Sequence, residues 1–311
     1  MNLQNELRDL LRIYKRWLRG ENFLFPAFLF AAVLVFLIAA FIFWQSLPAL
    51  REVGFVNLIF STDWEAYGIG GFIAASFLVT AISVSIAVVI GLPTAIFLAE
   101  FVPARIGGIL RPFIDMLAGI PSILYGMWGL YAFRPILKDN IAPFIDSVLG
   151  FIPFFRMPLA YAGYGALLAG IVLAIMIFPT FIGISNDAIR MVPSAYREAS
   201  VALGATRWET VKKVVLPNAS SGIVVALILC IGRVIGETMA VLFLCGGGEK
   251  IPQTIYEICM PMTAKIAGAV GYNLDNPMAM SALFMIGFVL FLISLVLILM
   301  VNLVMRRGKM A

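Results

Sequence analysis

Residues 279–305 read AMSALFMIGFVLFLISLVLILMVNLVM, a run that contains no Asp, Glu, Lys or Arg. The hydrocarbon core of a bilayer is about 30 Å thick, and an apolar helix of about 20 residues crosses it. Lipid offers the backbone no hydrogen-bond partners, so a single apolar run must satisfy its own amide groups as a helix. The run therefore predicts a transmembrane helix.

Five further apolar blocks of similar length lie between this run and the N-terminus. The whole chain is 62% apolar and 13% charged, whereas soluble domains are about half apolar and about a quarter charged. The sequence therefore predicts an all-α fold, a polytopic membrane bundle of about six transmembrane helices. The expected spans are 23–44, 70–98, 109–131, 160–184, 222–244 and 279–305.

Lys and Arg residues are divided unequally between the two sides of the predicted bundle. Fifteen of the 22 lie in the N-terminal arm, in the second-to-third and fourth-to-fifth connections, and in the C-terminal tail. Six lie on the opposite side, and Arg233 falls inside a span. Because positively charged residues are retained in cytoplasmic loops, we expect both the N- and the C-terminus in the cytoplasm.

Several classes of function are excluded by what the sequence lacks. The chain contains no histidine, which removes Ser-His-Asp and Cys-His catalysis and the commonest metal ligand. It contains no G-x-x-x-x-G-K-[ST] motif, so we do not expect it to hydrolyse ATP alone. Its basic residues are dispersed between apolar blocks, which argues against nucleic acid binding. We therefore expect a chain that is not an enzyme and that binds no metal or cofactor itself.

The connection between the fourth and fifth spans contains PSAYREASVALGATRWETVKKVVLP, residues 193–217. Ser194 can cap a first short helix, and Gly204 can end it in the left-handed conformation. The run TRWE from Thr206 matches a capping box and predicts a second helix, which Pro217 would end. From these residues alone, a hairpin that only joins two spans and a docking surface for another protein are equally supported.

Span five contains GRVIGETMAV, residues 232–241, in which Arg233 and Glu237 are separated by about one helical turn. A charge near the bilayer centre costs about 3 kcal/mol, so such residues usually face a partner or a water-filled path. Either Glu237 simply neutralises Arg233, or an incoming oxyanion displaces it, because a guanidinium fork donates two parallel hydrogen bonds to an oxyanion. The residues alone leave both readings open. Gly232 and Gly236 would let a second helix approach closely.

Span three contains GIPSILYGMWGL, residues 119–130. Gly119, Pro121 and Ser122 could open this helix and expose backbone groups to a cavity, as broken helices do in transporters. Close packing against a partner helix explains the same small residues at least as well. A gating role and a packing role therefore both stay open.

The connection between spans four and five resembles a loop shared by ABC importer permeases. Glu198-Ala199-Ser200, followed by Gly204, is similar to their E-A-A-x-x-x-G motif, although Ser200 replaces the usual second Ala. In that family the cytoplasmic helix that carries the motif sits in a cleft of the ATPase subunit. The resemblance therefore implies that Glu198, Ala199, Ser200 and Gly204 couple this chain to an ATPase.

The membrane segments resemble one family more narrowly. The G-R-x-x-G-E-T run around Arg233, together with segments 119–130 and 170–193, is similar to the phosphate ABC transporter permease subunits, the PstC-like family. The likeness covers roughly the C-terminal two-thirds of the chain. It implies that Arg233, Glu237 and Thr238 lie on the substrate path.

The same resemblance implies partners, a location and a function. The expected partners are a second homologous, PstA-like permease subunit, two PstB-like ATPase subunits that carry ATP and Mg, and an extracytoplasmic PstS-like phosphate-binding protein. The expected location is the plasma (inner) membrane of a prokaryote, where lipid surrounds a multi-pass chain. The implied function is that of a permease subunit in an ATP-driven importer of inorganic phosphate.

Two alternatives to a phosphate importer stay open. An ABC importer of another oxyanion, molybdate or sulfate, would use a similar membrane subunit, whereas a secondary transporter or channel would work without ATPase subunits. The importer interpretation divides the chain into four parts. They are a cytoplasmic amphipathic arm (1–22), a first transmembrane helix with an extracytoplasmic loop (23–69), a permease core (70–306) with a cytoplasmic coupling loop (190–217), and a cytoplasmic tail (307–311).

Overall fold

The structure is a computed structural model that describes residues 24–308. The predicted arm at 1–22 lies outside the described residues, as do residues 309–311 of the predicted tail. The described part is helical almost throughout and contains no strand, only one isolated β-bridge between Gly246 and Cys259. The predicted all-α fold is confirmed.

Five helices of the described chain are long and apolar enough to cross a membrane, and a sixth span results when one bent pair is counted as a unit. The prediction of about six spans is confirmed. The spans are α2 (Leu24–Val53), α4 (Gly70–Ile86) to η3 (Phe97–Phe101), the bent pair of α6 (Ala104–Ala118) with α7 (Ser122–Trp128) to α9 (Ala142–Leu149), α10 (Ala166–Arg190), α12 (Arg207–Thr210) to α13 (Leu216–Ile235), and α16 (Pro277–Gly308). The shorter connecting helices are α3 (Phe55–Phe60), α11 (Ser194–Ala202), α14 (Met239–Leu244) and α15 (Met262–Ala269).

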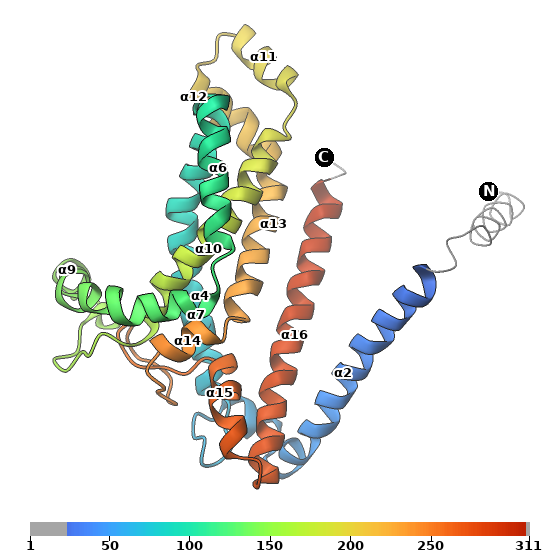
Figure 1. Ribbon diagram of the computed structural model, residues 1–311, viewed down its shortest axis with the longest axis vertical. Coiled ribbons are helices and arrows are strands. Elements are labelled where there is room, and N and C mark those ends of the chain that lie inside the picture. Colours follow the sequence, from blue (N-terminus) through green and yellow to red (C-terminus); the bar gives the residue numbers. More distant parts are fainter. Residues whose placement is uncertain (1–23, 309–311) are drawn as a thin grey trace, which may run out of the picture.

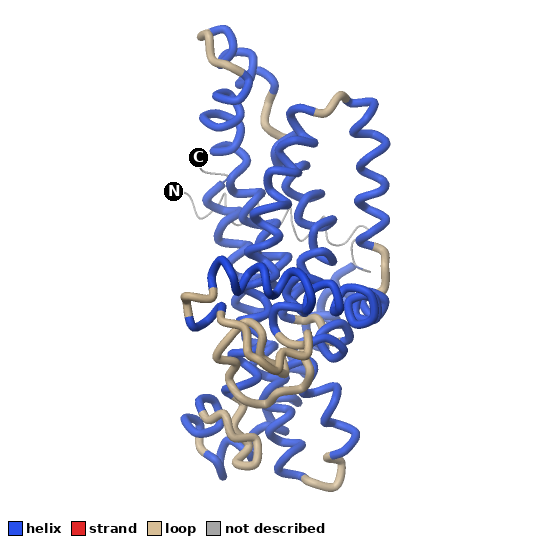
Figure 2. The backbone as a smooth tube through the Cα atoms, turned by 90° about the vertical axis from the view of Figure 1, so that its left-hand side faces the viewer, coloured by secondary structure: helices blue, strands red, loops and turns tan. Residues whose placement is uncertain are grey.

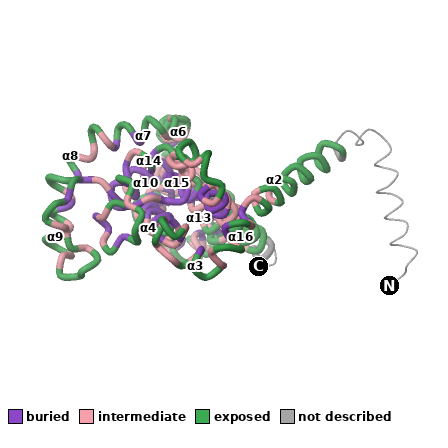
Figure 3. Tube along the Cα trace, turned by 90° about the horizontal axis from the view of Figure 1, so that it is seen from below, coloured by how far each residue is buried: buried purple, intermediate pink, exposed green. Residues whose placement is uncertain are grey.

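Helix α10 forms the centre of the bundle, and α4, α6 and α13 pack around it (Figure 1). Close packing of α10 on α4 depends on Gly170, because a Cβ there would lie only 2.4 Å from the Ile82 Cγ2. By contrast, α2 leans away from the bundle and most of its apolar residues stay exposed (Figure 3), although its last turns pack against α16 and bury Ala49. An exposed apolar helix of this length is what a bilayer stabilises and water does not.

The two ends of the bundle carry different structures. Helices α11 and α12 stand at one end of the bundle. The start of α2 and the end of α16 are both directed toward this same end (Figure 1). Most of the loops gather toward the opposite end, around α14 and α15 (Figure 2). This arrangement agrees with the topology expected from the Lys and Arg count. Which end faces the cytoplasm stays a prediction.

Several prolines in or directly after the spans follow widened helical turns, whereas Pro48, Pro112 and Pro179 lie inside α-helices. Five π-helical segments each end two residues before a proline: η2 (Ala87–Gly91), η3 (Phe97–Phe101), η4 (Gly129–Phe133), η5 (Leu137–Ile141) and η7 (Val211–Val215). A proline has no N–H and its ring clashes with the carbonyl four residues earlier, a contact that a π turn changes. The prediction that Pro217 ends a helix is therefore wrong, since η7 precedes it and α13 (Leu216–Ile235) continues the span.

Two of the predicted spans are not continuous helices. The span expected at 109–131 bends by 88° at residues 119–121, because Pro121 disfavours a helical conformation for the residue before it. The span expected at 222–244 breaks at residues 236–238, between α13 and α14. Both breaks fall on segments that the sequence singled out for function.

Candidate functional site

The two helix breaks are linked by the helices that follow them. Gly119, Pro121 and Ser122 lie at the bend between α6 and α7, so the third span is interrupted at these residues, and their gating or packing role stays a prediction. Helix α7 then packs against α14, which follows the second break. At their contact a Cβ on Gly126 would lie 3.1 Å from the Ala240 Cα, so the two helices meet at backbone distance.

Tyr125 stabilises the bend between α6 and α7. Its hydroxyl donates a hydrogen bond of 2.8 Å to the carbonyl of Leu117, near the end of α6. The last carbonyls of a helix have no partner within that helix, so this side chain satisfies a group that the bend exposes. Tyr125 is itself buried, and the bend is therefore a packed, hydrogen-bonded feature of the fold.

Arg233 lies in the last turn of α13, directly before the second break. Its side chain is half-buried, and its Nη1 donates to the Oγ1 of Thr180 on α10 at 3.1 Å. Among residues 24–308 it forms no ion pair with a carboxylate. The predicted pair with Glu237 is absent because α13 ends before Glu237, so a spacing of four residues no longer places both on one helical face.

Glu237 acts on the backbone of the break. Its Oε1 accepts a hydrogen bond from the N–H of Ala240, 3.3 Å away, in the first turn of α14. Its carbonyl accepts one from the Oγ1 of Thr263 on α15, at 2.5 Å. Thr238 follows directly and precedes the first residue of α14. The carboxylate thus caps α14 and leaves the guanidinium of Arg233 without a negative partner.

The two glycines predicted to admit a close helix differ in their surroundings. A Cβ on Gly232 would lie 3.8 Å from the Leu297 Cδ1, which is ordinary contact distance to α16. Gly236 ends α13, where a Cβ would lie 3.3 Å from the carbonyl oxygen of Gly232 in its own helix. The structure therefore brings Gly232, Gly236, Arg233, Glu237 and Thr238 together at the break.

The predicted coupling residues lie at the other end of the bundle, on and after α11. No residue of α11 is buried. Glu198 and Ala199 are exposed to solvent, whereas the Ser200 hydroxyl lies 2.9 Å from that of Thr210, which is buried. An open groove of about 490 Å³ runs between α11 and the start of α13, and Leu203, with 89% of its surface exposed, lies on its edge. The outer face of α11 therefore has no packing partner within residues 24–308.

The local geometry of the coupling element follows most of its predicted signals. Gly204 has φ of +86°, the left-handed conformation that glycine adopts readily. Thr206 and Glu209 form the predicted capping box, with the Glu209 Oε2 accepting from the Thr206 N–H at 3.0 Å. The predicted cap by Ser194 is wrong, because α11 begins at Ser194 itself and Pro193 precedes it. The bend at Gly204 and the second cap are therefore confirmed.

Two residues that the sequence prediction missed attach α11 to the bundle. The Nη2 of Arg197 lies 2.7 Å from the Oε1 of Glu100 and also donates to the carbonyl of Ile189 at 2.9 Å. A further bond joins Nη1 to the carbonyl of Val192. Glu100 is the only charged residue between Gly70 and Phe101. An isolated carboxylate at the end of an apolar span was the available signal for a buried partner.

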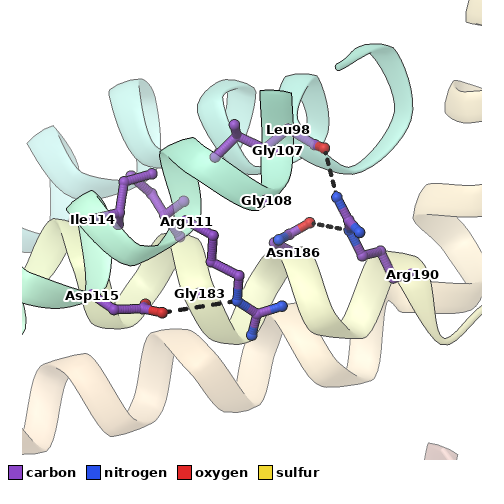
Figure 4. Close-up of a pocket in the computed structure, with 10 residues that line it drawn as sticks. Leu98, Gly107, Gly108, Arg111, Ile114, Asp115, Gly183, Asn186 and Arg190 are labelled. Atoms are coloured by element: carbon purple, nitrogen blue, oxygen red, sulfur yellow. Dashed lines mark hydrogen bonds and ion pairs between the residues drawn. The ribbon is translucent and has the colours of Figure 1, made fainter. Parts of the chain in front are cut away.

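A small cavity of about 130 Å³ lies between α6 and α10, toward the end that carries α11 (Figure 4). Arg111 pairs with Asp187 at 2.9 Å and with Asp115 at 3.9 Å. Arg190 donates to the Asn186 Oδ1 at 3.0 Å and to a backbone carbonyl of η3 at 3.1 Å. Carboxylate, amide and carbonyl oxygens of the protein therefore bind both guanidinium groups and tie α6, α10 and η3 together, whereas Arg233 donates to the neutral hydroxyl of Thr180.

Comparison with known sequences gives one consistent result. The family model described as "Binding-protein-dependent transport system inner membrane component" matches residues 91–309. The phosphate transport system permease protein PstC of Pasteurella multocida is 35% identical over 288 residues, which cover 89% of each chain. The probable phosphate transport system permease protein PstC of Methanocaldococcus jannaschii is 36% identical over 279 residues, which cover 87% of this chain and 88% of that one.

Solved structures support the same architecture. A chain from "Inward facing conformations of the MetNI methionine ABC transporter" superposes with a TM-score of 0.51 at 22% identity, covering 74% of this chain and 93% of that chain. At that identity the likeness supports the fold alone, which is that of an ABC importer permease. The chain is thus a multi-pass membrane permease subunit rather than an enzyme. It belongs to the binding-protein-dependent transport system inner membrane components and, within them, to the PstC family of permeases.

Proposed function

We propose that this chain is one of two permease subunits of an ATP-driven importer, and that its substrate is inorganic phosphate. The relatives in the PstC family are named as phosphate transport permeases. The observation that carries the proposal is Arg233, a half-buried guanidinium beside a helix break that forms no ion pair among residues 24–308. A cation held inside an apolar bundle without a carboxylate attracts an anionic substrate.

The chemistry of Arg233 suits a tetrahedral oxyanion. Its planar fork can donate two parallel, charge-assisted hydrogen bonds, which are shorter and stronger than neutral ones. One nitrogen is directed by the Thr180 hydroxyl, which fixes the side chain before substrate arrives. We expect the anion to occupy the space beside the free edge of the guanidinium, where the hydroxyl of Thr238 can add a donor.

The two helix breaks supply the movable part of the path. Broken helices in transporters place free backbone groups at a binding site and allow half-helices to change their orientation. In this chain α7 and α14 touch each other through Gly126 and Ala240, so a movement of one half-helix reaches the other. We propose that access alternates through displacement of this α7–α14 pair relative to α10 and α13.

In this proposal, ATP hydrolysis on a partner subunit drives the displacement through α11. We propose that the exposed surface of Glu198, Ala199 and Leu203 docks into an ATPase subunit, and that Arg197 and Glu100 carry its movement into α4 to η3 and α10. The complete importer would contain a PstA-like second permease, two PstB-like ATPases that bind ATP and Mg, and a PstS-like phosphate-binding protein. This chain itself would hold no cofactor.

Transport by the reconstituted complex tests the proposal. Vesicles that hold the permease pair, the ATPases and the binding protein are supplied with labelled phosphate, sulfate or molybdate, with ATP inside or absent. We expect ATP-dependent uptake of phosphate, with sulfate and molybdate below one tenth of that rate. Preferred uptake of sulfate or molybdate would establish the other oxyanion function. Uptake by this chain without ATPase subunits would contradict the importer and support a secondary transporter or channel, an alternative that its family membership already opposes.

A paired substitution tests the role of Arg233 separately. If Arg233 and Glu237 serve only to hold the bundle together, replacing both with Met should leave phosphate import at the parental rate. We expect import to be lost, because the two side chains do not neutralise each other here and Arg233 has no substitute cation. Glu237→Gln alone should reduce import less, since an amide oxygen can still cap α14. Protein level and ATPase association, measured by co-purification, are expected to stay near parental in the single variants.

A further inference from the structure

Lys265 on α15 is a buried charge far from the coupling element. Only 4% of the residue is exposed. Its Nζ lies 2.5 Å from the Oε1 of Glu249, 3.9 Å from the centre of the Trp64 ring and 5.0 Å from that of Phe72. These partners come from three different segments: the loop after α14, the loop between α3 and α4, and α4 itself. One ammonium group therefore joins both outer loops to α15.

Burial of this ammonium is not needed for packing. A charged group in a low-dielectric surrounding is expensive to desolvate, and a hydrophobic side chain of similar volume often gives equal or greater stability. The attraction of the cation to two aromatic faces and to a carboxylate offsets that expense only while all three partners are in place. The position of Lys265 is therefore sensitive to where Trp64 and Glu249 lie.

Helix α15 also holds the helix break beside Arg233. Two residues before Lys265, the Thr263 hydroxyl donates to the backbone carbonyl of Glu237 at 2.5 Å. The preceding residue, Met262, donates its N–H to the Ser76 hydroxyl on α4 at 2.9 Å. The first turn of α15 is thus attached to α4 on one side and to the break between α13 and α14 on the other.

The outer partners of Lys265 face an accessible surface. Glu249 is 44% exposed at its side chain, and it lines, together with Trp64, an open cavity of about 600 Å³ at the end of the bundle opposite α11. The backbone of Glu249 packs closely on α4, because a Cβ on Gly71 would lie 2.3 Å from the Glu249 carbonyl oxygen. A macromolecule seated on this cavity would contact Glu249 directly, and Lys265 through it.

We propose that Lys265 is a positioning residue that transmits the arrangement of the two outer loops, through α15 and Thr263, to the helix break beside Arg233. The inference rests on the proposed function, in which a substrate-binding protein docks at this end of the bundle. Docking that shifts Glu249 or Trp64 changes the position of Lys265, and α15 then moves the carbonyl of Glu237. Docking of the loaded binding protein would thereby change the geometry of the substrate path.

The test uses the complete complex in vesicles and separates transmission from stability. We expect Lys265→Met to reduce, by tenfold or more, the stimulation of ATPase activity by the phosphate-loaded binding protein, and to lower the kcat of uptake similarly. Basal ATPase activity, complex yield and the KM for uptake should stay within twofold of parental. Lys265→Arg keeps the cation and should restore at least half of the stimulation. Lys138→Met, at an exposed lysine outside this cavity, serves as the matched control and should behave as parental.

Three outcomes overturn the inference. The first is normal stimulation in Lys265→Met, and the second is an equal fall of basal and stimulated ATPase activity, which marks a purely structural pair. If Lys265→Met does not yield a complex, Thr263→Val replaces it in the test, because this variant removes only the hydroxyl that donates to the Glu237 carbonyl. The third outcome that overturns the inference is normal stimulation of ATPase activity in Thr263→Val. A parental complex that imports no phosphate contradicts the proposed function instead, whatever the variants do.

Discussion

The coupling element at residues 193–217 and the helix break at residues 236–238 differ in what determines their shape. In the coupling element, the turn and the second helix start are set by residues a few positions away, as in the capping box of Thr206 and Glu209, and only its attachment to the bundle through Arg197 and Glu100 is distant. In the break, the backbone is held by Thr263 of α15 and by packing on α7. Local interactions are readable from a sequence, whereas interactions across the bundle are not.

The strongest way to test this difference is to change Arg233 to Lys. The charge remains, but the planar fork that donates two parallel hydrogen bonds is lost. Loss of a charge-assisted hydrogen bond costs about 1.5–3 kcal/mol, so we expect phosphate uptake to fall about 10- to 100-fold. Uptake in vesicles at matched protein content measures the effect. Uptake at the parental rate by Arg233→Lys would mean that a positive charge at this position is sufficient. The planar geometry of the guanidinium would then not be needed for transport.

Gly204→Ala should have the next largest effect. The residue has φ of +86° with open space around it, so the methyl group clashes with nothing and only the left-handed backbone is strained, at about 1–2 kcal/mol. We expect the bend after α11 to change and uptake to fall by about tenfold. Gly54→Ala is the control for backbone strain, because Gly54 has φ of +80° and ψ of 149°, a conformation that glycine adopts most readily, and equally open surroundings away from α11. If both variants lower uptake alike, general destabilisation explains the result and docking does not.

Arg197→Met should have an intermediate effect on coupling. It leaves Glu100, whose side chain is only 9% exposed, without its cation and removes the bonds to the end of α10. Leaving one partner of a buried pair uncompensated is destabilising, and we expect uptake to fall about three- to fivefold, a loss of about 1 kcal/mol. ATPase co-purification and uptake, measured together, check this expectation. Unchanged uptake would show that α11 moves independently of the bundle.

The matched control for Arg197→Met is Lys213→Met. Lys213 pairs with Glu209 across one helical turn at 3.3 Å, with 70% and 44% of the two side chains exposed. Exposed pairs of this kind contribute about 0.3–0.5 kcal/mol, so we expect uptake close to parental. The contrast between an anchored and an exposed ion pair of the same element then measures what anchoring contributes.

The limits of the sequence prediction follow from the same distinction. Apolar length identified the spans, and a positive φ at Gly204 followed from its place at the end of a helical pattern. The pairing of Arg233 with Glu237 assumed a continuous helix, and no local signal shows that α13 ends at Ile235. Glu100 and Arg197 lie 97 residues apart in sequence, so their contact depends on the packing of α11 against α10 and η3.

Apart from the Lys213→Met control, Ser200→Ala should have the smallest effect, and it tests whether the coupling element depends on its side-chain bonds or on its backbone shape. Ser200 stands where the similar E-A-A-x-x-x-G motif has its second Ala, and its hydroxyl forms a hydrogen bond of 2.9 Å with that of the buried Thr210. Losing this neutral hydrogen bond costs about 0.5–1.5 kcal/mol of stability. Because the exposed surface of α11 and the bend at Gly204 are unchanged, we expect uptake within about twofold of parental, with a slightly lower thermal midpoint of the complex. A loss as large as that of Gly204→Ala would mean that the Ser200–Thr210 bond, and not the glycine, fixes the angle between α11 and α12.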